Sequence, residues 1–132
     1  MLIDASAFYP QAAIVDGWVA ANSFHEKNKD VLTRIIQAWA KANDYLVQNP
    51  EQAIATLQRE RYQNVPLPEL MDQFKAEKVF TSREWRAKYA DGTVTQWLQQ
   101  VTDFFTAFAK IENPVPASQY FDISLYLAAI KE

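Results

Sequence analysis

Residues 11–22 are the one long segment of this chain that favours a β-strand, and nearly everything after them favours helix. The segment runs Gln-Ala-Ala-Ile-Val-Asp-Gly-Trp-Val-Ala-Ala-Asn and lacks the apolar spacing of a helix. A single strand cannot pair its own backbone donors and acceptors, so it needs neighbours in a sheet. This chain offers almost none. Either the segment is not a strand, or its partners come from another segment or another chain, as in part of a larger α/β domain.

Asp16 lies in the middle of that apolar segment. Burying an unpaired carboxylate costs several kcal/mol or shifts its pKa. Asp16 therefore ends the apolar run at the surface, has a buried partner, or faces a ligand. Trp18 lies on the same face, because side chains of a strand alternate with a period of two.

Apolar spacing after residue 28 predicts five or six helices. The first covers 29–48, with Asn28 as its N-cap and one apolar stripe. Asn49 and Pro50 then begin a second helix that ends near Tyr62, with Gln52 as the partner in a capping box. The stripe of the first helix consists of Val31, Leu32, Ile35, Ile36, Trp39, Ala42 and Leu46.

The second half of the chain continues the helical pattern. A third helix is predicted at about 68–78, followed by a short extended link at 79–80 that is the candidate for a second strand. Thr81 or Ser82 caps a fourth helix to about residue 90. Thr93 caps the longest amphipathic stretch, with Gln96 as its box partner, and Asp122 caps a last short helix. The long stretch places these residues on one face, interpreted as core: Val94, Trp97, Leu98, Val101, Phe104, Phe105 and Phe108.

Composition excludes several classes of function. The net charge of −3 provides no basic excess for nucleic acid, and the two glycines, Gly17 and Gly92, cannot form a glycine-rich phosphate loop. There is no cysteine, and the single His25 cannot hold a metal alone, so we expect neither a metal nor a cofactor. No apolar run reaches the roughly 18 residues of a membrane span. The N-terminus of this chain does not resemble a signal peptide.

The sequence also argues against an enzyme. No Gly-x-Ser-x-Gly motif surrounds any serine, and only His25 could serve as a histidine base. Carboxylates such as Glu69 and Asp72 fall at the spacing of a solvated helix face. We therefore expect no catalytic residues.

The order of these features resembles periplasmic solute-binding proteins of the nitrate, taurine and sulfonate type, a group that includes binders of thiamin pyrimidine precursors. Residues 15–24 (Val-Asp-Gly-Trp-Val-Ala-Ala-Asn-Ser-Phe) before a helix resemble the return segment of that family. Residues 49–53 (Asn-Pro-Glu-Gln-Ala) resemble its helix restart, and Phe80-Thr81 its next helix entry. Residues 115–122 (Val-Pro-Ala-Ser-Gln-Tyr-Phe-Asp) resemble its C-terminal end. The resemblance covers nearly the whole chain but only the C-terminal part of such a protein.

The resemblance implies a hinged, two-lobed α/β receptor of the periplasmic-binding-protein type II fold that closes on a small solute and delivers it to an ABC permease. Residues 1–132 would form a single partial domain of it. Residues 1–22 would be the crossover and hinge strand, and 23–132 the helical C-terminal part of the first lobe. The parent protein would be periplasmic, or anchored outside the cytoplasm as a lipoprotein.

The resemblance also implies a ligand site. In taurine-like relatives the acid at the position of Asp16 faces the cleft and holds the amine of the substrate. Trp18 would line the cleft or the core, and Tyr9 and Gln11 lie near the same opening. The expected solute is small and anionic or zwitterionic, such as taurine, an alkanesulfonate or nitrate. No arginine lies near Asp16 in the sequence, so the contacts to an anion should come largely from segments outside this chain.

Two alternatives belong to other classes. The chain could be a helical regulatory or interaction domain, homologous to such a receptor and fused to or associated with a transporter subunit. An enzyme of the pyrimidine-synthase branch would need a metal-linked histidine site, for which this chain supplies only His25. Self-association is a further expectation, because an unpaired strand edge invites pairing with a second copy.

Overall fold

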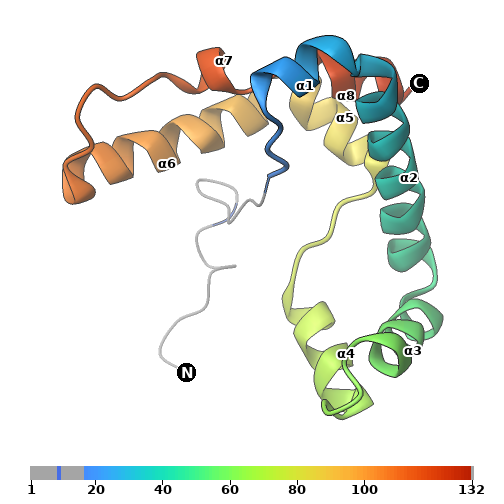
Figure 1. Ribbon diagram of the computed structural model, residues 1–132. Coiled ribbons are helices and arrows are strands. Elements are labelled where there is room, and N and C mark those ends of the chain that lie inside the picture. The colour runs from blue at the N-terminus through green and yellow to red at the C-terminus, as the bar shows by residue number, and fades with distance from the viewer. Residues whose placement is uncertain (1–8, 10–16, 132) are drawn as a thin grey trace.

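The computed structural model describes Tyr9 and residues 17–131. Within these residues the chain contains eight α-helices and no β-strand (Figure 1). The mainly helical class is therefore confirmed, with two short helices, α1 and α7, that the apolar spacing did not predict. The helices are α1 (Asn22–Lys27), α2 (Lys29–Gln48), α3 (Pro50–Glu60), α4 (Leu67–Ala76), α5 (Ser82–Ala90), α6 (Thr93–Ala109), α7 (Ala117–Tyr120) and α8 (Ser124–Ala129).

The predicted strand is wrong over its described part. Residues 17–21 are irregular and exposed, and α1 begins at Asn22. The carbonyl of Ala21 accepts the backbone N–H groups of Phe24 and His25 at 2.9 Å each, which turns the chain into a helix instead of a sheet ladder. Residues 11–16 lie outside the described residues. The link at 79–80 has no regular secondary structure and forms no strand in the part of the chain that the structure describes.

Local sequence signals set the helix boundaries, although several caps differ from the prediction. Asn28 and Asn49 occupy N-cap positions, but neither side chain caps its helix, and each amide instead donates back to a carbonyl of the preceding helix. The predicted box between Asn49 and Gln52 is therefore absent. Thr81, one of the two predicted caps, is the N-cap of α5, and it forms a full capping box with Glu84 that was not predicted.

The long helix α6 begins differently from the prediction as well. Its N-cap is Gly92, at φ 84°, and not Thr93. Glycine adopts this left-handed conformation without steric cost, which lets the chain reverse between α5 and α6. Asp91 accepts the N–H of Thr93 at 2.9 Å and so satisfies one of the first donors of the helix. Ile123 is likewise the N-cap residue of α8, with Asp122 accepting the N–H of Ser124 at 2.8 Å.

The helices pack around a core formed by α2, α5, α6 and α8. Helix α8 lies against both α2 and α5, and α6 continues from α5. From this centre α2 leads to α3 and α4 at one end of the molecule, while α6 extends away at the other (Figure 1). Phe80, Val94 and Trp97 form the buried cluster. The partly buried residues packed against it are Tyr9, Trp85, Tyr89, Leu98 and Phe121.

A polar clamp holds residues 80–82 in place between α2, α5 and α8. Asn43 of α2 donates to the carbonyl of Phe80 at 2.7 Å. The carboxylate of Asp44 accepts the backbone N–H of Ser82 at 2.6 Å and its hydroxyl at 2.5 Å. The hydroxyl of Tyr126 donates to the carbonyl of Ser82 at 3.2 Å. These bonds point the ring of Phe80 into the buried cluster.

Two tyrosine rings join α5 to α8. Tyr89 and Tyr126 stack with centroids 4.2 Å apart and planes 4° apart. Burial raises the pKa of both hydroxyls above the ordinary value of 10.0, so both rings are neutral at physiological pH. In the described part of the chain, no helix has the length and apolar character needed to cross a membrane.

Candidate functional site

Tyr9 is the one predicted ligand residue that the structure places on the core. Its half-buried ring lies 6.0 Å from the ring of Phe80 and 6.2 Å from that of Trp97, centroid to centroid. These distances are typical of tilted aromatic pairs, which contribute beyond their buried area. We call Tyr9, Phe80 and Trp97 the aromatic platform. Through Tyr9 the platform connects the N-terminal part of the chain to α6 and to the link before α5.

Two lysine ammonium groups lie over the aromatic platform. The Nζ atom of Lys78 is 4.3 Å from the ring centroid of Tyr9 and 5.6 Å from that of Phe80. The Nζ atom of Lys88 is 4.7 Å from the centroid of Phe80 and 5.6 Å from that of Trp97. A cation within about 6 Å of a ring centroid is attracted to the ring face. The platform therefore holds two positive charges around one phenylalanine.

The carboxylates near these lysines have other hydrogen-bonding partners. Thr81 donates to Glu84, and these bonds, with smaller contributions from Lys78 and Lys88, hold the pKa of Glu84 below its ordinary value of 4.5. Asp91 is bonded to Thr93 in the same way. Among the described residues, neither lysine forms an ion pair with a carboxylate. Both ammonium groups thus keep donors available to an anion, although Glu84 offsets part of their charge.

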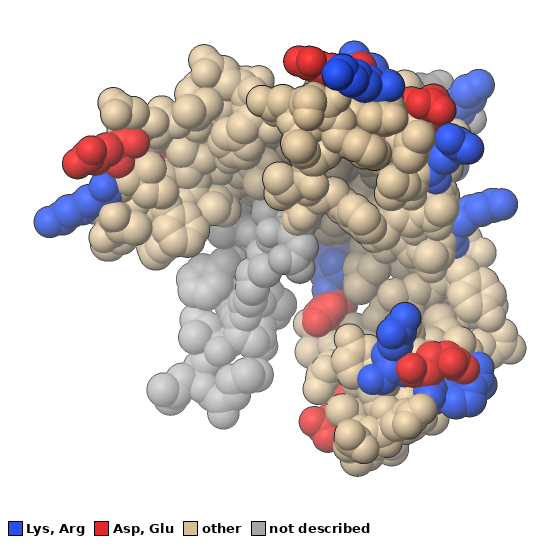
Figure 2. Space-filling view, in the orientation of Figure 1, with Lys and Arg blue, Asp and Glu red and all other residues tan. Residues whose placement is uncertain are grey.

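The lysines could not have been assigned to this site from the sequence. Lys78 and Lys88 are remote from Tyr9 along the chain and fall in polar stretches of the kind that usually faces solvent. The expectation that contacts to an anion come largely from segments outside this chain stays a prediction, and Lys78 and Lys88 are two candidate donors within the chain. Figure 2 shows acidic and basic side chains intermixed on the face seen there, with no broad patch of either sign.

Trp18, the other predicted ligand residue within the described part of the chain, does not join the platform. Trp18 is 78 % exposed, and within the described residues its ring takes no part in the contacts that Tyr9 makes. Asp16 and Gln11 lie outside the described residues. Asp16 follows Tyr9 by seven positions in the sequence. A fully extended chain of that length spans roughly 25 Å, which is the largest possible separation of the two residues.

Helix α1, which follows the predicted ligand segment, is tied to the C-terminal part of the chain. His25 Nε2 lies 2.9 Å from an oxygen of Asp122, the residue before the N-cap of α8. Hydrogen bonds from Ser124, with a smaller contribution from His25, hold the pKa of Asp122 below its ordinary value of 3.8. The native state therefore favours the ionised carboxylate.

This pKa shift predicts an acid-sensitive contribution to stability. Because the folded-state pKa of Asp122 is lowered, its contribution is complete above pH 3.8 and is lost as the pH falls through the folded pKa. The variant Asp122→Asn should therefore show a shallower fall of the unfolding free energy below about pH 5. Urea unfolding at stepped pH measures this slope. Parallel curves for the two proteins would show that Asp122 makes no such contribution.

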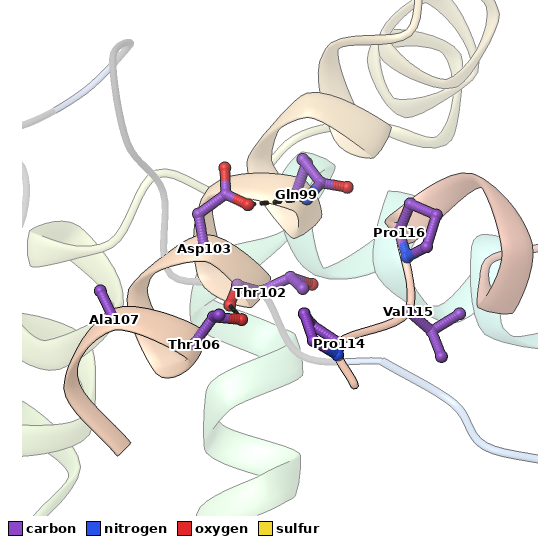
Figure 3. Close-up of a pocket in the computed structure, with 8 residues that line it drawn as sticks. All are labelled: Gln99, Thr102, Asp103, Thr106, Ala107, Pro114, Val115 and Pro116. Carbon is purple, nitrogen blue, oxygen red and sulfur yellow. Dashed lines mark hydrogen bonds between the residues drawn. The ribbon is translucent and has the colours of Figure 1, made fainter. Parts of the chain in front are cut away.

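A groove of about 310 Å³ lies between α6 and residues 114–116 (Figure 3). Gln99 donates to Asp103 at 2.8 Å across its wall and accepts the backbone N–H of Ala117 at 2.9 Å. Thr102 is bonded to the hydroxyl of Tyr120 at 2.9 Å. The polar groups of the groove thus bind one another and fasten α7 to α6, and neither Tyr9 nor Trp18, the predicted ligand residues that the structure describes, lines it. We therefore interpret the groove as a packing seam.

No metal site is formed within the described residues, where His, Asp and Glu side chains do not gather in groups of three or more suited to hold an ion.

Comparison with known proteins supports a relationship to binding proteins. Relatives named "Putative binding protein" from Brucella abortus (strain 2308), Brucella suis biovar 1 (strain 1330) and Brucella melitensis biotype 1 are each 28% identical to this chain over 116 residues. The match covers 88% of this chain and 36% of each relative, so the chain spans about a third of the length of the curated relatives that it matches. No family model matches the chain, and neither does any solved structure.

Proposed function

We propose that this chain is the C-terminal segment of the substrate-binding component of an ABC importer and that it contributes part of a site for a small anionic or zwitterionic solute. The observation that carries the proposal is the aromatic platform, where Lys78 and Lys88 lie over Tyr9, Phe80 and Trp97. The similarity of this chain, over 88% of its length, to a protein named as a putative binding protein supports the same role.

The chemistry of the platform suits an acid group such as a sulfonate, a carboxylate or nitrate. A lysine ammonium group has three donors, and charge-assisted bonds to an anion are about twice as strong as neutral ones. The rings beneath exclude water from one side of the ammonium groups, which strengthens their interaction with an anion. Taurine and alkanesulfonates combine such a head group with a short carbon chain.

The predicted residues outside the platform complete this proposal. Asp16 would hold the amine of a zwitterion at the opposite end of the solute from the lysines. Trp18 and Gln11 would line the same opening when the lobes close. The receptor would be two-lobed and extracytoplasmic, would deliver its solute to a permease, and would bind without catalysing a reaction.

The proposal is tested by titrating the chain with taurine, ethanesulfonate and nitrate while recording the NMR signals of the tryptophan indoles. We expect saturable shifts of the Trp97 indole with millimolar affinity, because part of the cleft would lie outside this chain. The double variant Lys78→Ala/Lys88→Ala should weaken binding about tenfold or more, which corresponds to the loss of a charged hydrogen bond. Lys75→Ala is the matched control, because this exposed lysine pairs with Asp72 at 3.9 Å on α4.

Each outcome of the titration has a stated meaning. Equal affinity in the double variant and the wild type would refute the role of the lysines. Absence of any shift at concentrations on the order of 10 mM, where even a Kd of 1 mM (about −4 kcal/mol) would be saturated, would refute the site. Micromolar binding by this chain alone would refute the claim that it holds only part of the site.

A second candidate function is a helical interaction or regulatory domain associated with a transporter subunit. The observation that favours it is the exposed aromatic surface on α6, where Phe104, Phe105 and Phe108 are 55, 47 and 75 % exposed. Such surfaces on soluble proteins commonly mark sites of protein contact.

A further inference from the structure

The apolar stripe of α6 is buried along one half of the helix and exposed along the other. Val94 and Trp97 are 4 and 3 % exposed, whereas Val101 and Phe104 are 38 and 55 % exposed. The prediction that the whole stripe forms core is therefore wrong for its C-terminal half. We call these residues the α6 aromatic surface: Val101, Phe104, Phe105, Phe108 and the following Ile111, which is 50 % exposed.

The rings of this surface are ordered against one another. Phe104 lies 5.5 Å from Phe105 in an edge-to-face arrangement and 4.7 Å from Phe108, centroid to centroid. Helix α6 extends away from the other long helices at this end, so no other long helix covers the surface (Figure 1). The surface is a contiguous aromatic patch and not a set of scattered exposed side chains.

None of the five residues that form the α6 aromatic surface is charged, and Lys110 and Glu112 flank Ile111 at its end. Asp103 is the only charged residue within α6, and it lines the groove shared with residues 114–116, on the other side of the helix. A neutral apolar face has no means of attracting nucleic acid or acidic lipid head groups, which require cations. It also presents no like charges that would repel a second copy of itself.

The area of the surface matches one side of a small dimer interface. A phenylalanine side chain offers roughly 200 Å², so the exposed fractions of the three rings leave roughly 350 Å² of aromatic area. Val101 and Ile111 bring the total to roughly 500 Å². A standard interface buries about 800 Å² per partner, of which 56–65% is apolar, and therefore needs a patch of about this size.

We propose that the α6 aromatic surface binds the same surface of a second copy of this chain. In a two-fold symmetric dimer each subunit contributes the same residues, so a neutral, straight and aromatic helix face is complementary to itself. Phe105 and Phe108 would lie at the centre of the interface, where aromatic side chains contribute most of the binding energy. The inference rests on exposure and chemistry along α6 and does not depend on the solute-binding proposal.

Sedimentation equilibrium of the full chain over a range of concentrations tests this dimer. We expect a reversible dimer for the wild type and at least about a 30-fold weaker association for Phe105→Ser, as for loss of an interface hot spot. The control is Ile35→Ser on α2, a residue that is 38 % exposed but lies outside the α6 aromatic surface. It should dimerise like the wild type. A monomeric wild type, or equal association in Phe105→Ser, would overturn the proposal.

A second measurement remains decisive if Phe105→Ser fails to fold. The chain contains no cysteine, so a single Ala109→Cys introduces one thiol at the edge of the α6 aromatic surface. Mild oxidation should link two copies through this thiol much faster than through Ala38→Cys on the exposed side of α2. Equal rates for the two variants would contradict pairing through α6. The proposal would also be contradicted if the chain remained monomeric and instead cosedimented with neutral lipid vesicles.

Discussion

Replacing Trp97 by alanine is expected to lower the free energy of unfolding by about 3–5 kcal/mol, as large aromatic truncations in cores do. Trp97 is 3 % exposed and belongs to the buried cluster with Phe80 and Val94. Its ring also packs against the ring of Tyr9, and its centroid is 5.6 Å from the Nζ atom of Lys88. Truncation would leave a cavity at the centre of the contacts that join α6 to the link before α5.

The effect of Trp97→Ala is measured by urea unfolding followed by circular dichroism. Domains of this size are stable by only about 5–15 kcal/mol, so the variant should unfold at a much lower urea concentration or be unfolded without urea. Trp18→Ala is the matched control, because Trp18 is 78 % exposed and its loss should change stability by less than about 0.5 kcal/mol. Similar losses in the two variants would show that Trp97 is not a core residue.

Replacing Asp44 by alanine is expected to destabilise the fold by about 1–3 kcal/mol. The carboxylate accepts two hydrogen bonds from Ser82, a residue that is only 9 % exposed. Removing the carboxylate leaves the backbone N–H and the hydroxyl of Ser82 without this acceptor. The free energy of unfolding then falls by the cost of desolvating these donors. The loss should loosen α5 from α2.

Chemical denaturation with matched variants measures the contribution of Asp44. Asp44→Asn keeps one carbonyl acceptor and should lose roughly half as much stability as Asp44→Ala. Asp30→Ala removes an exposed carboxylate that pairs with Arg34 at 3.3 Å, and such surface pairs contribute about 0–1 kcal/mol. If Asp44→Ala were no more destabilising than Asp30→Ala, the clamp on residues 80–82 would not be a stabilising element.

The helices were the part of the fold that local sequence signals predicted well. Helix α2 covers the predicted range 29–48, and α3 begins at the predicted proline. Thr81, one of the two caps predicted for α5, was also confirmed. The caps at Asn28 and Asn49 were not, because each amide found a carbonyl of the preceding helix as a competing acceptor.

Of the residues that form the aromatic platform and its lysines, only Tyr9 was named as a ligand residue from the sequence, and its role in binding stays a prediction. The aromatic platform combines Tyr9 with Lys78 and Lys88, and no sequence spacing connects these residues. They meet because the clamp around Ser82 orients Phe80 and because Gly92 reverses the chain between α5 and α6. The predictions for Asp16 and Gln11 fall outside the described residues and stay predictions.

By itself the sequence determined the helical class, most helix boundaries and the absence of cysteine chemistry. These follow from apolar periodicity, from proline and glycine positions, and from composition, which are all local properties. Only the tertiary structure decided that residues 17–21 are irregular, that two lysines lie over the ring of Phe80, and that the stripe of α6 leaves the core after Trp97. An apolar stripe identifies the face of a helix that is favourable to bury. Whether that face is buried depends on elements distant in the chain or on a second molecule.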